Sequence, residues 1–258
     1  SEMCIRDRGV SHMLNVTARQ DLMSKIIETL GVVVEDARFD FGEGGLEVRV
    51  VDPSHVAMIQ MNIDAAAFDT WEIDESKLGL ELRKIKELVS LGAATDMIEM
   101  AFNAESGVFT LNLGKIDRNI RPLDDSTMNV PTLPNLELPC TVKLSGADLG
   151  QALRAARQVG DLVNLSIDAN TFTVHVQGST DSVTVAFHKD ELQSLECANP
   201  ARSQYSLTYL VPMAKVFGPL ETVEVGFGEN YPLSMKFSFN DGAANVQYFL
   251  APRVENDY

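Results

Sequence analysis

Apolar residues recur along this chain at two spacings, one typical of β-strands and one typical of α-helices. Residues 108–113 alternate between apolar and polar side chains, which predicts a half-buried strand. Leu22, Ile26 and Leu30 lie four residues apart, which predicts a helix with one buried face. Thr17-Ala-Arg-Gln20 resembles a capping box that would start this helix. The first half of the chain therefore reads as strand, helix, three strands, helix and a final hairpin.

The same order of elements recurs in the second half. A strand at 140–144 is followed by a helix that begins after Ser145, then by three strands. A second helix near 209–217 and three further strands complete the series, which ends at residue 250. Two successive units with the same order of elements indicate an internal duplication. We therefore expect an α+β fold of two duplicated domains, each with two helices on antiparallel sheets.

The chain divides into four segments. Residues 1–12 show no periodicity, and we interpret them as a leader left from cloning or sequence assembly. We expect an N-terminal domain at 13–120 and a C-terminal domain at 140–256. Between them, 121–139 contains four prolines, which predicts an extended connector. The leucines in this segment suggest that it lies along an apolar surface, although a connector pinned to the domain faces would have the same composition.

Composition narrows the classes of protein and partner. The 258 residues include 37 acidic and 21 basic side chains, a net charge of −16, which repels nucleic acid and anionic membranes unless basic residues are gathered in a patch. No apolar stretch is long enough to predict a membrane span. Cys4, Cys140 and Cys197 are widely spaced and odd in number, which favours a reducing compartment over a disulfide framework or a zinc site.

Positive charge is concentrated in the predicted helices. The segments 19–30, 83–91, 148–159 and 208–217 hold eight basic and four acidic residues, which leaves 13 basic and 33 acidic residues for the rest. If these helices share one side of the sheets, that side suits sequence-independent contact with phosphates. The alternative is that lysine and arginine occur there only because they favour helices. Aromatic residues are scarce nearby, so duplex contact fits better than base stacking on a single strand.

No catalytic motif stands out. The glycines of Gly42-Glu-Gly44 and Gly226-Phe-Gly228 precede predicted strands, which indicates hairpin turns and not phosphate-binding loops. The four histidines have no ligand spacing, so we predict no metal and no cofactor. The carboxylates are too numerous for a catalytic pair to be recognised. An enzyme on a duplicated α+β scaffold, using scattered carboxylates in the cytosol, remains a distant alternative.

Three stretches resemble a known family. Val51-Asp-Pro-Ser-His-Val-Ala-Met-Ile-Gln60 resembles the signature of sliding clamps of the proliferating cell nuclear antigen (PCNA) type. Phe68-Asp-Thr-Trp71 and the ending Leu250-Ala-Pro-Arg253 do so as well, in register with the duplication. The resemblance extends from Met13 to about Glu255 and is archaeal in character.

The resemblance implies a non-enzymatic ring, usually a homotrimer, that encircles duplex DNA and acts as a polymerase processivity factor. The expected partners are DNA polymerase, a clamp loader, a ligase and a nuclease that bind through short peptides. The expected location is the cytoplasm of an archaeon, or the nucleus if the source is eukaryotic. A subunit of a heterotrimeric or checkpoint clamp is the alternative within the same fold. The basic side chains that the resemblance places on DNA are Lys25, Arg83, Lys84, Lys86, Arg154, Arg157 and Lys215.

The resemblance also implies two protein contacts. Subunits would join by edge strands, 107–115 of one and 181–189 of the next, with side chains that could equally pack inward on their own helices: Phe109, Leu111, Leu113, Val183, Val185 and Phe187. Partner peptides would enter an apolar pocket between the domains, although ordinary core packing competes for its two valines. The pocket residues are Val51, His55, Val56, Met58, Leu133, Pro134, Leu138, Pro232, Phe249, Ala251 and Pro252.

Overall fold

Each half of the described chain contains two α-helices and nine strands in the same order. The computed structural model describes residues 13–254, so the predicted leader 1–12 and the last two residues of the predicted C-terminal domain lie outside the described residues. The elements of the first half are β1 (Met13–Arg19), α1 (Gln20–Gly31), β2 (Asp36–Gly42), β3 (Gly45–Val51), β4 (Ala57–Asp64), β5 (Thr70–Ile73), β6 (Ser76–Glu81), α2 (Leu82–Val89), β7 (Met97–Asn103), β8 (Val108–Leu113) and β9 (Ile116–Ile120).

The second half repeats this order after an extended segment. Its elements are β10 (Cys140–Leu144), α3 (Gly146–Arg157), β11 (Leu162–Ile167), β12 (Thr171–Gln177), β13 (Ser182–His188), β14 (Ser194–Cys197), β15 (Ala201–Ser206), α4 (Leu207–Phe217), β16 (Val223–Phe227), β17 (Leu233–Phe239) and β18 (Ala244–Leu250). Position by position, β4 corresponds to β13 and β9 corresponds to β18. The predicted duplication is confirmed.

The two halves share one sheet. Nine strands from both halves are hydrogen bonded in the order β14-β10-β16-β17-β18-β4-β3-β2-β6, and β4 pairs with β18 at the point where the halves meet. A five-stranded sheet, β5-β1-β7-β8-β9, belongs to the first half, and a four-stranded sheet, β13-β12-β11-β15, belongs to the second. The corresponding strands β9 and β13 therefore lie at edges of the two smaller sheets.

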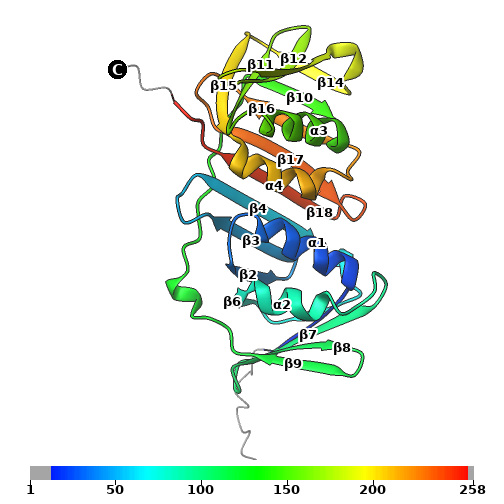
Figure 1. The fold of residues 1–258 in the computed structure, drawn as a ribbon. Coiled ribbons are helices and arrows are strands. Elements are labelled where there is room, and N and C mark those ends of the chain that lie inside the picture. Colours follow the sequence, from blue (N-terminus) through cyan, green and yellow to red (C-terminus); the bar gives the residue numbers. More distant parts are fainter. Residues whose placement is uncertain (1–12, 255–258) are drawn as a thin grey trace, which may run out of the picture.

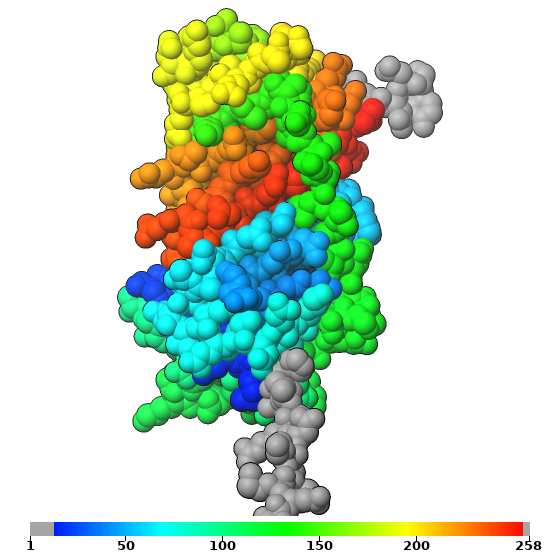
Figure 2. All heavy atoms as spheres, turned by 180° about the vertical axis from the view of Figure 1, so that it is seen from behind, coloured from blue at the N-terminus to red at the C-terminus, as the bar shows by residue number. Residues whose placement is uncertain are grey.

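All four helices lie on one face of the molecule (Figure 1). They pack in the order α3, α4, α1, α2, with α1 and α4 in contact where the halves meet. The strands lie behind the helices in this view, and from behind the segment 121–139 runs along one side of the molecule from one half to the other (Figure 2). Within residues 13–254 no helix combines the length and the apolar character needed to cross a membrane.

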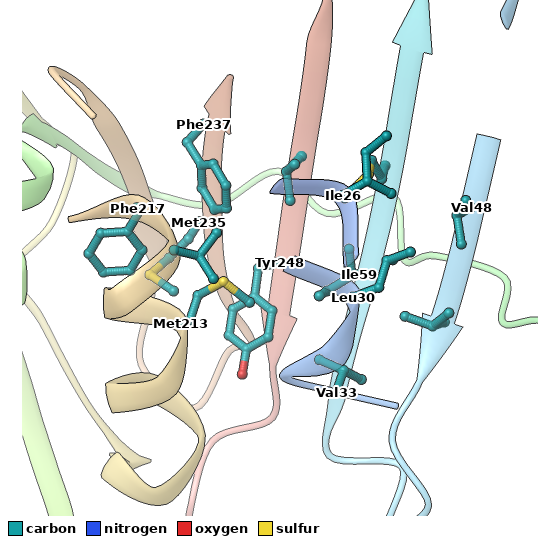
Figure 3. Packing of buried hydrophobic residues seen from close by; sticks show 14 of the residues in the cluster. Ile26, Leu30, Val33, Val48, Ile59, Met213, Phe217, Met235, Phe237 and Tyr248 are labelled. Carbon is teal, nitrogen blue, oxygen red and sulfur yellow. The ribbon is translucent and has the colours of Figure 1, made fainter. Parts of the chain in front are cut away.

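The core at the junction is formed by α1, α4 and the strands beneath them. Ile26 and Leu30 of α1 lie over β4 and β3, while Met213 of α4 lies close to Tyr248 of β18 (Figure 3). Each of these residues is at most 1% exposed. Burial of large apolar side chains from both halves is a main source of stability here, since each contributes roughly 1.5–3 kcal/mol.

The two predicted helix starts have different outcomes. Ser145 caps α3 as expected, because its hydroxyl accepts a hydrogen bond from the backbone N–H of Asp148 at 3.1 Å. The capping box at Thr17 is wrong. Thr17 is part of β1, and the N-cap of α1 is Arg19, whose side chain makes no capping hydrogen bond. The apolar stripe of α1 nonetheless packs as predicted, so tertiary burial stabilises this helix without a side-chain cap.

Candidate functional site

The helical face carries the basic residues that the sequence singled out. Lys86, Arg154 and Lys215 are exposed and form no ion pair among the described residues. Three further basic residues are each paired with a carboxylate: Arg83 with Glu87 at 2.8 Å, Arg157 with Asp161 at 2.6 Å and Lys84 with Glu81. Because exposed pairs of this kind are weak, a stronger anion can compete for them.

Lys25 has a different environment from the other six residues. It is half-buried, and its Nζ donates a hydrogen bond to the carbonyl oxygen of Val216 near the C-terminal end of α4. A cation at that position interacts favourably with the unpaired carbonyls and the dipole of the helix. The contact joins α1 of the first half to α4 of the second. Lys25 therefore stabilises the junction, and its charge is only partly presented on the helical face.

One predicted subunit edge is wrong. Residues 107–115 contain β8, which is hydrogen bonded to β7 on one side and to β9 on the other, so its backbone has no free edge. Phe109 and Leu111 are fully buried and Leu113 is 9% exposed. These side chains pack inward because they form the core face of the five-stranded sheet. The free edge is β9, whose residues Ile116, Arg118 and Ile120 are the cross-strand partners of the same three side chains.

The other predicted edge, 181–189, contains a strand at the border of its sheet. β13 pairs with β12 alone, and its core-facing side chains Val183, Val185 and Phe187 are only half-buried. Lys189 donates its backbone N–H to the carbonyl oxygen of Asn170. Counting back from Lys189, every second residue of β13 is therefore hydrogen bonded to β12 through its backbone. The N–H groups of Thr184 and Ala186 consequently point away from β12, toward the open side.

The two edges differ in chemistry. Arg118 on β9 is bound to Glu87 of α2 at 2.8 Å, and Glu87 also binds Arg83. The hydrogen bond from Arg118 holds the pKa of Glu87 below its ordinary value, with the charges of Arg118 and Arg83 acting in the same direction. An inward-pointing charge on a short strand is a typical way of keeping an edge from pairing indiscriminately. Ile116, at the start of β9, is 43% exposed.

Part of the predicted peptide pocket is assembled by strand register. Val51, Met58 and Phe249 are neighbours across β3, β4 and β18. Leu138 of the connector lies against the same surface, because it lines with Phe249 a small pocket of about 100 Å³ over β16–β18. Val51 and Phe249 are buried, whereas Met58 and Leu138 are half-buried. For Val51, core packing accounts for most of its surface.

The remaining pocket candidates come from the loop before β4, the connector, the residue before β17 and the chain after β18. Val56 accepts a hydrogen bond at 2.9 Å through its carbonyl oxygen from the backbone N–H of Ala251, which joins the loop before β4 to the chain after β18. His55 is exposed and has a φ of 58°, a left-handed conformation that turns this loop sharply. Four further residues are half-buried, two in the connector and two beside β17 and β18: Leu133, Pro134, Pro232 and Pro252.

Asp52 organises this loop, and the sequence analysis did not assign it a role. Its carboxylate accepts backbone N–H bonds from Ser54, Val56 and Ala57 at 3.1, 2.6 and 2.8 Å. It also accepts a hydrogen bond at 3.2 Å from the hydroxyl of Tyr209 in α4, so it connects the two halves. Burial opposes ionisation, but these hydrogen bonds outweigh it and hold the pKa of Asp52 below its ordinary value.

The structure offers no metal centre in the part of the chain that it describes. Within 13–254, no three His, Cys, Asp or Glu side chains are grouped so that they could hold an ion. The features that do gather are a basic helical face, the open edges of β9 and β13, and an apolar surface beside the connector. These are features of a binding protein.

Comparisons with known proteins agree with one another. The sequence matches the family models described as "Proliferating cell nuclear antigen, N-terminal domain" over residues 13–129 and "Proliferating cell nuclear antigen, C-terminal domain" over 132–253. The DNA polymerase sliding clamps of Methanococcoides burtonii and Methanosarcina acetivorans are each 33% identical over 246 residues, covering 95% of this chain and 100% of each relative.

Solved structures have the same fold. A. fulgidus PCNA bound to the C-terminal region of FEN-1 aligns with a TM-score of 0.88 and 28% identity, covering 95% of this chain and 100% of that one. PCNA from Thermococcus kodakaraensis aligns with a TM-score of 0.85 and 22% identity, covering 93% of this chain and 100% of that one, which supports the fold.

Proposed function

Because the chain belongs to the proliferating cell nuclear antigen family of sliding clamps, we propose that it encircles duplex DNA as a homotrimeric ring and tethers replication proteins to it. The role requires no catalysis by this chain. Its partners would be DNA polymerase, a clamp loader, a ligase and a nuclease, acting on DNA in an archaeal cytoplasm. The proposal rests mainly on three exposed basic residues, Lys86, Arg154 and Lys215. They lie on helices that share one face of a strongly acidic protein.

Ring closure follows from the duplication. Within the chain, β4 of the first half pairs with β18 of the second. The corresponding strands are β13 and β9, and both are edges. A second copy that places its β9 against β13 would repeat the internal joint between chains. Because the two edges differ, this contact is head to tail and closes into a ring when the rotation allows it.

The helical face would then line the hole. Lys86, Arg154 and Lys215 come from three of the four helices, which spreads positive charge along the face. Point charges on flexible stems attract phosphates without reading bases, which permits sliding. The acidic remainder of the surface repels DNA from the outside of the ring.

Partner peptides would dock beside the connector, at the surface formed by Met58, Leu138 and Phe249. A methionine and a leucine at its border are adaptable side chains that can repack around different apolar anchors. The FEN-1 segment bound to A. fulgidus PCNA supports this kind of contact, since that protein covers 95% of this chain at 28% identity.

Charge reversal on the helical face tests the DNA proposal. We expect the double variant Arg154→Glu, Lys215→Glu to lose most of its loading onto nicked circular DNA, because each ring carries six reversed charges. The reason is that attraction to phosphates falls with each basic residue removed. Loader-dependent retention of the clamp on circular DNA by gel filtration measures this effect.

The matched control is Lys77→Glu, Lys143→Glu. These two lysines are exposed on β6 and β10, next to buried side chains of the same strands that point toward the core, so the control makes the same charge change on the opposite face. It should load as the unmodified chain does. Equal loss in both variants would refute the assignment of the helical face to DNA.

A further inference from the structure

Two cysteines that are far apart in sequence meet across a pair of strands. Cys140 begins β10, directly after the connector, and Cys197 ends β14, one of the two edge strands of the nine-stranded sheet. They are register partners, and their Sγ atoms are 3.5 Å apart. The spacing of the cysteines along the chain does not predict this pair, because Cys140 and Cys197 are 57 positions apart.

Antiparallel strands have two kinds of residue pair, and the two cysteines occupy the kind with the shorter Cα–Cα distance. Ala198 donates its N–H to the carbonyl oxygen of Pro139, so the hydrogen bond lies just outside the pair. Cys140 and Cys197 therefore face each other at a non-hydrogen-bonded position, where Cα atoms are about 4.5 Å apart. That separation falls within the range of about 4.4–6.8 Å that disulfides span. A small rotation of the side chains would bring the sulfurs to bonding distance.

The two thiols differ in access. Cys140 is fully buried, while Cys197 is half-buried on an edge strand next to an exposed loop. Burial, together with the neighbouring Cys197, raises the pKa of Cys140 to about 12. Both thiols donate to the carbonyl oxygen of Asn199, at 3.3 and 3.0 Å. Asn199 lies in the exposed loop, so water can satisfy that carbonyl if the thiol protons are lost.

We propose that Cys140 and Cys197 form a reversible dithiol–disulfide site that reacts with low-molecular-weight disulfides. The thiolate of Cys197 attacks one sulfur of the small disulfide, whose S–S bond breaks and releases one thiol. Cys140 then gives up its proton, and its thiolate attacks the sulfur of Cys197, which forms the protein disulfide and releases the second thiol. The protein loses two electrons and two protons, and the small disulfide gains them.

The product would fasten a weakly held strand. β14 has four residues and pairs only with β10 in the described structure. The bond would also close a long loop of the unfolded chain, which is the usual reason that a disulfide stabilises a protein. We expect the melting temperature of the full chain to rise by about 5–15 °C on oxidation.

The first test follows the chemistry directly. The Cys4→Ser variant of the full chain removes the third thiol, and is equilibrated in mixtures of reduced and oxidised glutathione, alkylated and weighed intact. We expect a species lighter by two hydrogen atoms that takes up no alkylating agent, and a linked peptide that contains residues 140 and 197. Two alkylatable thiols in the most oxidising mixture would overturn the proposal, as would a glutathione adduct on Cys197 that never resolves.

The second test uses a matched variant in the same Cys4→Ser background. Cys197→Ser changes one half-buried atom and leaves Cys140 in place. Its melting temperature should be the same in reducing and oxidising mixtures, while that of the parent rises. A rise of equal size in both proteins would show that the stabilisation does not come from this pair.

Discussion

The junction between the two halves has a counterpart in the contact proposed between the edges of β9 and β13. At the junction, seven residues of β4 pair with seven of β18, and the side chains facing the helices are buried. The corresponding strands β13 and β9 each pair on one side only in the described chain, and most of their core-facing side chains are exposed or half-buried, although Ile120 is buried. In the proposed ring, each chain would therefore contribute one completed joint and the two halves of another.

The joints differ in what stabilises them. Tyr248 on β18 is 1% exposed and packs under α4, whereas Arg118, on the corresponding strand β9, bears a charge and pairs with Glu87. The internal joint is further braced by hydrogen bonds from Tyr209 to Asp52 and from Lys25 to Val216. A joint within one chain can be apolar and permanent. A joint between chains has to remain soluble while it is open, which a charged edge provides.

The largest effect is expected from a variant that breaks only the proposed contact between subunits at β13. Ala186→Pro removes an N–H that points away from β12, so it deletes a hydrogen bond to a neighbouring strand while leaving the β12 ladder intact. We expect the oligomer to be lost and the monomer to keep its fold. Sedimentation velocity measures the first and far-UV circular dichroism the second.

The matched control for this edge is Ala186→Thr, which keeps the backbone N–H and has a good strand propensity. It should assemble as the unmodified chain does. A proline variant that assembles normally would show that β13 is not part of the contact.

Variants at the junction between the two halves should instead lower the free energy of unfolding. Tyr248→Ala removes a fully buried ring from the core between α4 and β18, and we expect the free energy of unfolding to fall by about 3–5 kcal/mol. Tyr248→Phe removes only the hydroxyl, which donates a long hydrogen bond of 3.4 Å to Tyr209, and should cost about 1 kcal/mol or less. Urea denaturation of the monomer measures both. Similar losses for the two variants would contradict the packing account.

A smaller loss of stability is expected when the carboxylate of Asp52, which connects the two halves, is changed. Asp52→Asn keeps the shape but removes the charge that accepts three backbone N–H bonds, and should cost about 1–3 kcal/mol at neutral pH. The pKa of Asp52 is lowered in the folded state, so its contribution is present above its unfolded pKa of about 3.9 and is lost as pH falls through the folded value.

The difference in stability between the two proteins should therefore shrink as the pH falls below about 5. Urea midpoints measured from neutral to acidic pH test this directly. A difference that stays constant over the whole range would mean that the charge of Asp52 makes no contribution, and that the loop depends on shape alone.

The sequence predicts the repeated elements, the burial of their apolar faces and the edge at 181–189, but it misplaces the other edge at 107–115. Residues 108–113 alternate clearly because β8 is an interior strand with one face in the core. The real edge, Ile116–Ile120, is short and charged, and edge strands are usually of this kind. The features that protect an edge from mispairing are therefore the ones that conceal it in a hydrophobicity pattern.

Long-range register accounts for the other features that were missed. The pairing of Cys140 with Cys197 and the bond between Asp52 and Tyr209 each join residues more than fifty positions apart. Local patterning carries no information about such contacts. The cap at Ser145 was predictable because donor and acceptor lie within one turn of the same helix. The basic helical face was predictable because charge can be counted along each helix.

The native mass of the chain in solution tests the central claim most directly. Light scattering coupled to gel filtration, repeated over a range of protein concentrations, distinguishes the possible assemblies. If β9 of one copy completes β13 of the next in a closed ring, the mass should equal three times the 28.3 kDa chain. A mass of one chain at every concentration would contradict the account. A mass of two chains at every concentration would contradict it as well, because the proposed ring contains three copies.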